Sequence, residues 1–215
     1  MIIRHPVQSD LPNLLALEND SCDNHMRGSK SKLLYFLTRF NEYQYIIEDG
    51  NAIVGYLCAQ TISSTSSLLE SKFSEQCFIS DAQGEIVHLC SIAVGSNIRG
   101  NTGSVLRDNA LNMAKLNPRI KAVVTMTRCS NFMPSSSMSS EDDQYKEYEK
   151  YVHSGVDPTI FFHLTGGAKI IQICRDYRPE DVGNLGHGVL MQYDVEDVGS
   201  FAFIKHIWLI IFTSG

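Results

Sequence analysis

Three side chains of this 215-residue chain have types and positions that suit catalysis or ligand binding. The first is His163, which interrupts the apolar segment PTIFFHLTGGAKII. An imidazole titrates near neutral pH, so it can donate or accept a proton during a reaction. A histidine on an otherwise apolar helix is also commonly a packed core residue, and the segment by itself does not separate the two interpretations.

Thr127 and Arg178 are the other two candidates. Thr127 lies in KAVVTMTRC and, by the two-residue period of a strand, shares a face with Thr125. Its hydroxyl can donate a hydrogen bond, although threonine is also simply a good strand residue. Arg178 can bind a carboxylate or phosphate, or pin its own glycine-rich loop through an acidic side chain. We expect Asp181 to be a surface acid and His187 to be exposed to solvent.

Segment 88–115 predicts an anion site. An apolar strand at 88–94 is followed by the glycine-bearing loop 95–103 and by an amphipathic helix. The first backbone N–H groups of a helix lack partners within it, so they bind phosphate readily. The glycines let main chain approach a ligand, and Arg99 adds a positive charge. The patterns GxGxxG and GxxxxGK[ST] are absent, and an ordinary strand-to-helix connection would look similar.

These candidates are positioned by a predicted series of strands and helices around one sheet. Periodic apolar patterns predict strands at 1–7, 43–48, 52–60, 88–94, 121–129, 168–174 and 188–195. They predict helices starting near Pro12, over 30–40, after the glycine loop and over 157–165. The Ser-rich segment 61–84 is expected to be a loop with one helical turn around 68–73. A polar insertion holds a further helical candidate at 141–152.

Composition restricts the class of protein. A chain that is 43% hydrophobic and 20% charged fits a globular domain with a substantial core. The net charge of −6, without a Lys/Arg cluster, argues against nucleic acid as a partner. The six cysteines form no CxxC and no histidine pair has metal spacing, so we expect neither disulfides nor a metal. No secretory signal precedes the first strand, so we expect a cytoplasmic protein.

We divide the chain into a single domain at 1–195 and an apolar C-terminal tail at 196–215. The tail contains SFAFIKHIWLIIF, which is strongly apolar but includes a lysine and a histidine. This run is shorter than the ~20 residues needed to span a bilayer, which argues against a membrane protein. It can be an added strand, an interfacial anchor or a segment foreign to the domain.

Segment 88–115 resembles motif A of the GNAT acyltransferases. The shared pattern is SIAV, four residues, then RGxxGSxLRxxALxxAK. The resemblance implies the GNAT fold, an α/β (α+β) architecture with a central mixed, twisted sheet of about six to seven strands flanked by helices. It also implies that the pyrophosphate of acyl-CoA is bound by Val94, Arg99, Gly100, Asn101, Thr102, Gly103 and Ser104. The family usually writes RGxGxG, and this loop lacks the middle glycine.

Three further segments carry a more specific resemblance. TRCSNF, DPTIFFHLTGGAKI and YRPEDVGNLGHGVLMQYD resemble the GNAT-like domains of polyketide synthase loading modules, over about residues 2–195. Those domains are described as decarboxylating malonyl-CoA and, in some accounts, passing the acetyl unit to an acyl carrier protein. The resemblance implies that Thr127 and His163 are catalytic and that Arg178 binds substrate. A tryptophan that such domains place after the cysteine of the first helix is replaced here by Asp23.

Three functions remain open at this stage. The one we favour is an acyl-CoA-dependent, metal-free enzyme of polyketide biosynthesis that decarboxylates malonyl-CoA to an acetyl starter, with a carrier-protein thiol as a candidate acceptor. Loss of CO2 leaves an enolate, which donors on Thr127 and His163 would stabilise. The second is an acetyl-CoA-dependent N-acetyltransferase acting on an amine, with Glu85 or Asp23 as base. The third is an inactive acyl-CoA or carrier-protein binding module, which the shortened loop and the missing tryptophan favour.

Overall fold

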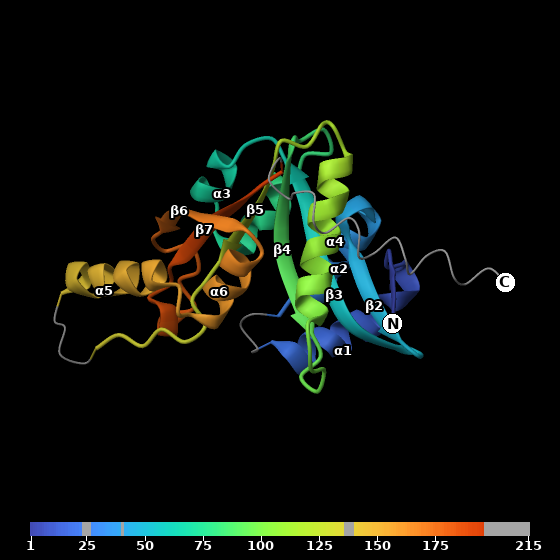
Figure 1. The fold of residues 1–215 in the computed structure, drawn as a ribbon, viewed down its shortest axis with the longest axis horizontal. Coiled ribbons are helices and arrows are strands. Elements are labelled where there is room, and N and C mark those ends of the chain that lie inside the picture. Colours follow the sequence, from blue (N-terminus) through green and yellow to red (C-terminus); the bar gives the residue numbers. More distant parts are fainter. Residues whose placement is uncertain (23–26, 40, 136–139, 196–215) are drawn as a thin grey trace.

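A single mixed sheet organises the molecule. The structure, a computed structural model, describes residues 1–22, 27–39, 41–135 and 140–195, so the predicted tail at 196–215 lies outside the described residues. Within the described ranges, seven strands have the order β1-β2-β3-β4-β5-β7-β6 (Figure 1). Neighbouring strands are antiparallel except β4 and β5, which are parallel. The predicted mixed sheet flanked by helices is confirmed.

The strands agree closely with the periodic apolar segments. They are β1 (Ile2–Arg4), β2 (Tyr45–Asp49), β3 (Ala52–Ile62), β4 (Ile86–Val94), β5 (Ala122–Thr127), β6 (Ala168–Cys174) and β7 (Gly188–Asp194). The β2–β3 hairpin turns at Gly50, whose φ of +61° favours glycine. β1 is shorter than the predicted strand at 1–7, because Pro6 has no N–H to donate to the ladder.

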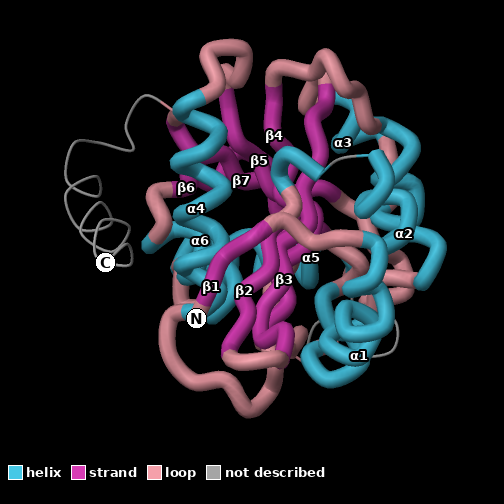
Figure 2. Tube along the Cα trace, turned by 90° about the vertical axis from the view of Figure 1, so that its right-hand side faces the viewer, coloured by secondary structure: helices cyan, strands magenta, loops and turns pink. Residues whose placement is uncertain are grey.

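Helices cover both faces of the sheet (Figure 2). They are α1 (Leu11–Ser21), α2 (Lys30–Arg39), α3 (Ser66–Glu70), α4 (Thr102–Leu116), α5 (Glu141–Ser154) and α6 (Pro158–Thr165). Apolar side chains of α1, α2 and α3 pack on one face, and those of α4, α5 and α6 on the other. The segment expected to be mainly loop holds α3 and a 3-10 stretch, η3 (Phe73–Ile79), because Leu68 has an apolar site to fill.

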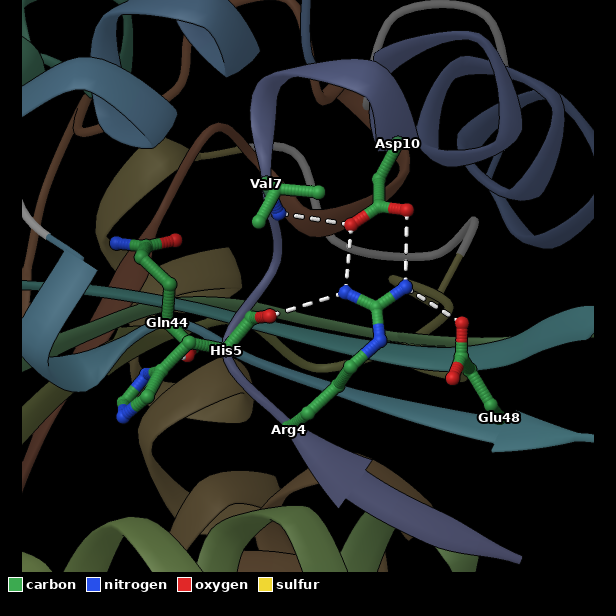
Figure 3. Close-up of polar contacts among 6 residues, drawn as sticks. All are labelled: Arg4, His5, Val7, Asp10, Gln44 and Glu48. Carbon is green, nitrogen blue, oxygen red and sulfur yellow. Dashed lines mark hydrogen bonds and ion pairs between the residues drawn. The ribbon is translucent and has the colours of Figure 1, made fainter.

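The first strand is tied to its neighbours by a polar cluster around Arg4 (Figure 3). The guanidinium donates to the two carboxylate oxygens of Asp10 at 2.7 and 2.9 Å and also to Glu48. The Asp10 carboxylate accepts a further hydrogen bond of 2.7 Å from the backbone N–H of Val7. The bonds from Arg4 lower the pKa of Asp10 and Glu48. The cluster therefore joins β1, β2 and the chain entering α1.

Candidate active site

The sheet opens where β4 and β5 stop pairing. Their parallel ladder ends with Leu89 opposite Thr125, although β4 continues to Val94 and β5 to Thr127. The register between β3 and β4 shifts beside this point, with Cys90 at the irregularity between Leu89 and Ser91. A cavity of about 600 Å³ lies at this opening. Its walls include the separated strand ends, the start of α4, part of α6 and the β6–β7 loop.

The cavity gathers the three side chains that the sequence singled out for chemistry. Thr127, His163 and Arg178 all line it, although they come from β5, α6 and the β6–β7 loop. Five of the predicted cofactor-binding residues line it as well: Val94, Gly100, Asn101, Gly103 and Ser104. The other two do not, since Arg99 is exposed and Thr102 is buried against β3.

The loop before α4 is fixed at both of its ends. Gly100 has a φ of +108°, a conformation that L side chains rarely adopt, where the chain turns into α4. At the other end, the carboxylate of Asp20 on α1 accepts hydrogen bonds from the backbone N–H and the hydroxyl of Ser96, at 2.7 and 2.8 Å. The first backbone N–H groups of α4 therefore lie at a defined place beside the cavity. They carry the positive end of the helix dipole.

His163 lies on α6 with its ring buried in the cavity wall. Its Nδ1 is 2.6 Å from Oη of Tyr193 on β7. Burial, helped by the charge of Arg107, lowers the pKa of His163 to about 3. The expectation of a group titrating near neutral pH is therefore wrong, because the packing of α6 on β7 excludes water from the ring. A neutral imidazole keeps one N–H that can donate a hydrogen bond.

Thr127 and Thr125 share a face of β5, as predicted, but their hydroxyls differ. Thr125 and Thr127 pair with Met191 and Val189 of β7 in the ladder. The Thr125 hydroxyl is buried and donates to the carbonyl of Leu89 at 3.1 Å. Both threonines line the cavity, but the Thr127 hydroxyl makes no hydrogen bond to any described residue. Thr127 is therefore the threonine available to a ligand.

Arg178 is a buried cation in the cavity wall. Its Cζ lies 3.3 Å from the ring centroid of Phe73, a close cation–π contact. Burial lowers the pKa of Arg178 to about 10, so the guanidinium stays charged at neutral pH. Asp181 is not the surface acid expected from the sequence, because it is 4% exposed and accepts hydrogen bonds from Arg128 and Asn184.

His187 corrects a second expectation. It is buried, with its ring centroid 5.5 and 5.2 Å from those of Tyr145 and Tyr148. Both tyrosines belong to α5, so the polar insertion folds over the β6–β7 loop and covers it. The loop sequence alone contains no sign of this cover. His187 also lines the cavity, and burial lowers its pKa.

The cavity wall is cationic. Arg178 lines it, together with Arg128, which is paired with the buried Asp181, and no Asp or Glu is found among the described residues of the wall. Glu85, which the sequence offered as a base for amine chemistry, forms an ion pair with Lys121 and does not line the cavity. Asp23, the other candidate base, lies outside the described residues. The field of such a wall favours an anionic ligand.

Sequence reasoning missed several residues that shape the site. Tyr193 falls at the two-residue period of the apolar face of β7, which predicts burial but not a bond to His163. Phe73 lies in a Ser-rich stretch without periodicity, and nothing there signals a contact with Arg178. Asp20 is an ordinary acid near a helix end, and its partner is distant in the sequence.

Comparison with solved structures decides the family. The GphF GNAT-like decarboxylase, in complex with isobutyryl-CoA, is 33% identical to this chain with a TM-score of 0.81, covering 91% of this chain and 100% of that one. This chain belongs to the GNAT superfamily. The loading GNATL domain of CurA from Lyngbya majuscula is 27% identical, with a TM-score of 0.82 and coverage of 91% and 98%. No family model and no curated protein sequence matches the chain.

The wider superfamily shares the fold with this GNAT protein. The ribosomal-protein-S18-alanine N-acetyltransferase from Escherichia coli is 14% identical with a TM-score of 0.59, covering 93% of this chain and 97% of that one. The GNAT architecture that the sequence predicted is thus confirmed. Among the described residues, no group of three or more His, Cys, Asp or Glu side chains could hold a metal ion. No helix in the described ranges is long and apolar enough to cross a membrane.

Proposed function

We propose that this GNAT protein binds an acyl-CoA thioester and decarboxylates malonyl-CoA to give an acetyl starter. The observation that carries the proposal is the convergence of Thr127, His163 and Arg178 in one cavity that also meets the N-terminus of α4. The N–H groups of that terminus suit a pyrophosphate. The GphF GNAT-like decarboxylase, whose complex holds isobutyryl-CoA, supports both the ligand class and the reaction.

The reaction needs charge stabilisation at one oxygen. The bond between Cα and the malonyl carboxylate breaks, its electron pair forms an enolate with negative charge on the thioester oxygen, and CO2 leaves. The O–H of Thr127 and the remaining N–H of neutral His163 donate hydrogen bonds to that oxygen. Each such preorganised donor is worth on the order of 10²–10³ in rate. Cα then takes a proton from water, the hydroxide that remains is neutralised in bulk solvent, and acetyl-CoA results.

Arg178 gives the site its preference for an acid. A guanidinium binds a carboxylate through paired charge-assisted hydrogen bonds, which places the malonyl group rather than a neutral acyl group. The cationic wall also favours decarboxylation over transfer to an amine, because an amine acceptor arrives as an ammonium ion and needs a base. The described wall contains two arginines and no carboxylate.

The acceptor of the acetyl unit is a finer part of the proposal. We assign the thiol of a phosphopantetheinyl carrier protein, in polyketide chain initiation. Support comes from the similarity to the CurA loading domain. A purified carrier protein, incubated with this protein and malonyl-CoA, should gain an acetyl mass on its pantetheine arm. A carrier protein without the pantetheine arm is the control.

Turnover of malonyl-CoA tests the main proposal. We expect CO2 and acetyl-CoA from the wild type, and loss of both in His163→Ala with binding of acetyl-CoA retained. Acetyl-CoA with a panel of amines is the second arm. Free CoA released only when an amine is present would instead identify an N-acetyltransferase. Binding of malonyl-CoA with no turnover in either arm would identify the inactive binding module.

A further inference from the structure

A buried hydrogen bond links the cavity histidine to β7. His163 Nδ1 and Tyr193 Oη are 2.6 Å apart, and the two residues are 6% and 1% exposed. Tyr193 lies opposite Val123 of β5 and Ala168 of β6, so its backbone is held by strands on both sides. The hydroxyl is therefore a fixed partner rather than a mobile surface group.

The direction of this hydrogen bond follows from its surroundings. Burial raises the pKa of Tyr193 above its usual range, so the hydroxyl keeps its proton. Within the described chain, Nδ1 of His163 is the one hydrogen-bond partner of that hydroxyl. If Nδ1 carried the ring proton, the hydroxyl proton would be buried without an acceptor, which is unfavourable. The hydroxyl thus donates to Nδ1.

A neutral imidazole has a single N–H. Because the Tyr193 hydroxyl donates to Nδ1, the ring proton must be on Nε2. We propose that Tyr193 is a positioning residue that holds His163 in the tautomer with its proton on Nε2 and so aims this N–H into the cavity. Nε2 is the ring nitrogen on the side away from Nδ1, and His163 lines the cavity. The use of this N–H in decarboxylation rests on the function proposed above.

The helix that carries His163 is held independently of Tyr193. Arg107 of α4 donates to the carbonyl of Phe162, and its guanidinium lies 4.6 Å from the ring centroid of Phe162. A Cβ on Gly166 would come within 2.5 Å of the same guanidinium, so α4 and the end of α6 are in close contact. Arg107 therefore places the backbone of α6, and Tyr193 sets the protonation of the ring.

The pair holds its protons under reaction conditions. For His163 to give its Nε2 proton to carbon, Tyr193 would have to release a proton into a buried site at the same time. We therefore assign the pair to hydrogen-bond donation and leave proton delivery to water.

Two readouts test the role of Tyr193 in the full-length protein. In wild type labelled with ¹⁵N-histidine, the His163 nitrogens should show the Nε2–H pattern, assigned by their absence in His163→Gln. Tyr193→Phe removes the donor to Nδ1, so the Nδ1 signal should move toward that of a ring nitrogen without a hydrogen bond. The substitution should also lower kcat for malonyl-CoA by at least about tenfold with KM within about twofold, because the ring is no longer held with its N–H toward the cavity.

Tyr45→Phe is the matched control. Tyr45 is buried in the same core, and its hydroxyl also makes one hydrogen bond, to the carbonyl of Glu42 at 2.9 Å. This variant should keep the wild-type tautomer and kcat. An Nδ1–H pattern in the wild type, or an unchanged Nδ1 signal and kcat in Tyr193→Phe, would overturn the proposal.

Two further measurements keep the test decisive. If Tyr193→Phe does not fold, the wild-type spectrum still reports the tautomer. His163→Gln, whose amide reaches toward the place of Nε2, should then retain more activity than His163→Asn, and the reverse order counts against the proposal. If the wild type decarboxylates nothing, the proposed function fails while the spectra still decide the role of Tyr193.

Discussion

At the scale of single residues, Thr127 and Thr125 differ in one hydrogen bond. The two side chains have the same type, strand and face, but the Thr125 hydroxyl is already bonded to Leu89. We expect Thr127→Val to lower kcat for malonyl-CoA by on the order of 10²–10³ with little change in folding. Thr125→Val should lower the unfolding temperature and leave kcat within a few-fold. Steady-state kinetics and thermal melts of both variants check this, and equal kinetic losses would contradict it.

Arg178 offers a second residue-scale prediction. Arg178→Gln should raise KM for malonyl-CoA by roughly tenfold to a hundredfold, because a hydrogen bond to a charged group is lost. The dissociation constant for acetyl-CoA, which has no carboxylate at that end, should change little. Calorimetry with both thioesters measures this difference.

The control for that experiment is Arg175→Gln. Arg175 is three residues away, half exposed, and stacks on Tyr145 outside the cavity wall. The Arg175→Gln variant should bind both thioesters with the affinity of the wild type. Equal weakening of malonyl-CoA and acetyl-CoA by Arg178→Gln would mean that Arg178 supports its loop rather than a carboxylate.

The sequence could predict which residues line the site where a motif contained them. It could not predict the burial or protonation of those residues. Thr127, His163 and Arg178 were chosen from their segments and resemblance, and the structure gathers them. The neutral state of His163, the burial of Asp181 and the burial of His187 all depend on elements remote in sequence. The sequence of a segment does not show which helix or strand will pack over it, as α5 does over His187 and β7 over His163.

At the scale of elements, the hydrogen bonds between α1 and the loop before α4 hold the loop of the proposed anion site. Asp20→Asn should weaken acyl-CoA binding by roughly threefold to tenfold, because one of the two hydrogen bonds to Ser96 loses its acceptor. The kcat at saturation should stay near that of the wild type. Calorimetric titration with acetyl-CoA measures the change.

Asp81→Asn is a matched control for Asp20→Asn. The Asp81 carboxylate likewise accepts from a hydroxyl, that of Ser63, and from a backbone N–H, that of Gln83, but it does not line the cavity. The Asp81→Asn substitution should leave the affinity for acyl-CoA unchanged. Equal affinities for the wild type and Asp20→Asn would show that the loop holds its shape without α1.

Elements with strong periodicity were predictable, and elements defined by their contacts were not. The strands at 168–174 and 188–195, and the helix at 157–165, agree with β6, β7 and α6 within a residue. η3 is different, because its segment shows no strand or helix period and is shaped by contacts such as the bond from the Phe73 N–H to the Tyr177 carbonyl. The separation of β4 from β5 was also invisible, since both segments look like uninterrupted strands.

At the scale of the whole molecule, buried neutral histidines predict sensitivity to acid. Burial lowers the pKa of His88 and of His163 to about 3, against about 6.5 in the unfolded chain. Between these values the unfolded chain binds more protons, so the free energy of unfolding falls as pH drops from about 6.5 toward 3. Each histidine contributes a slope of up to about 1.4 kcal/mol per pH unit.

Urea unfolding between pH 7.5 and 4.5 measures that slope. His88→Gln should flatten it, because one proton fewer is taken up on unfolding. The exposed His153, changed to glutamine, should leave it as it is. A free energy of unfolding that stays constant over this range would show that both rings accept protons in the folded protein.

The parallel ladder of Ile86–Leu89 against Ala122–Thr125 is the one strand pairing, among the described residues, that joins β1–β4 to the rest of the sheet. Beyond this short ladder, β4 and β5 are no longer paired. On the proposed function, a thioester bound in this cavity would contact both parts of the sheet, so its binding should raise the melting temperature of the domain. In a cell depleted of acyl-CoA, the protein would then be at its least stable against unfolding.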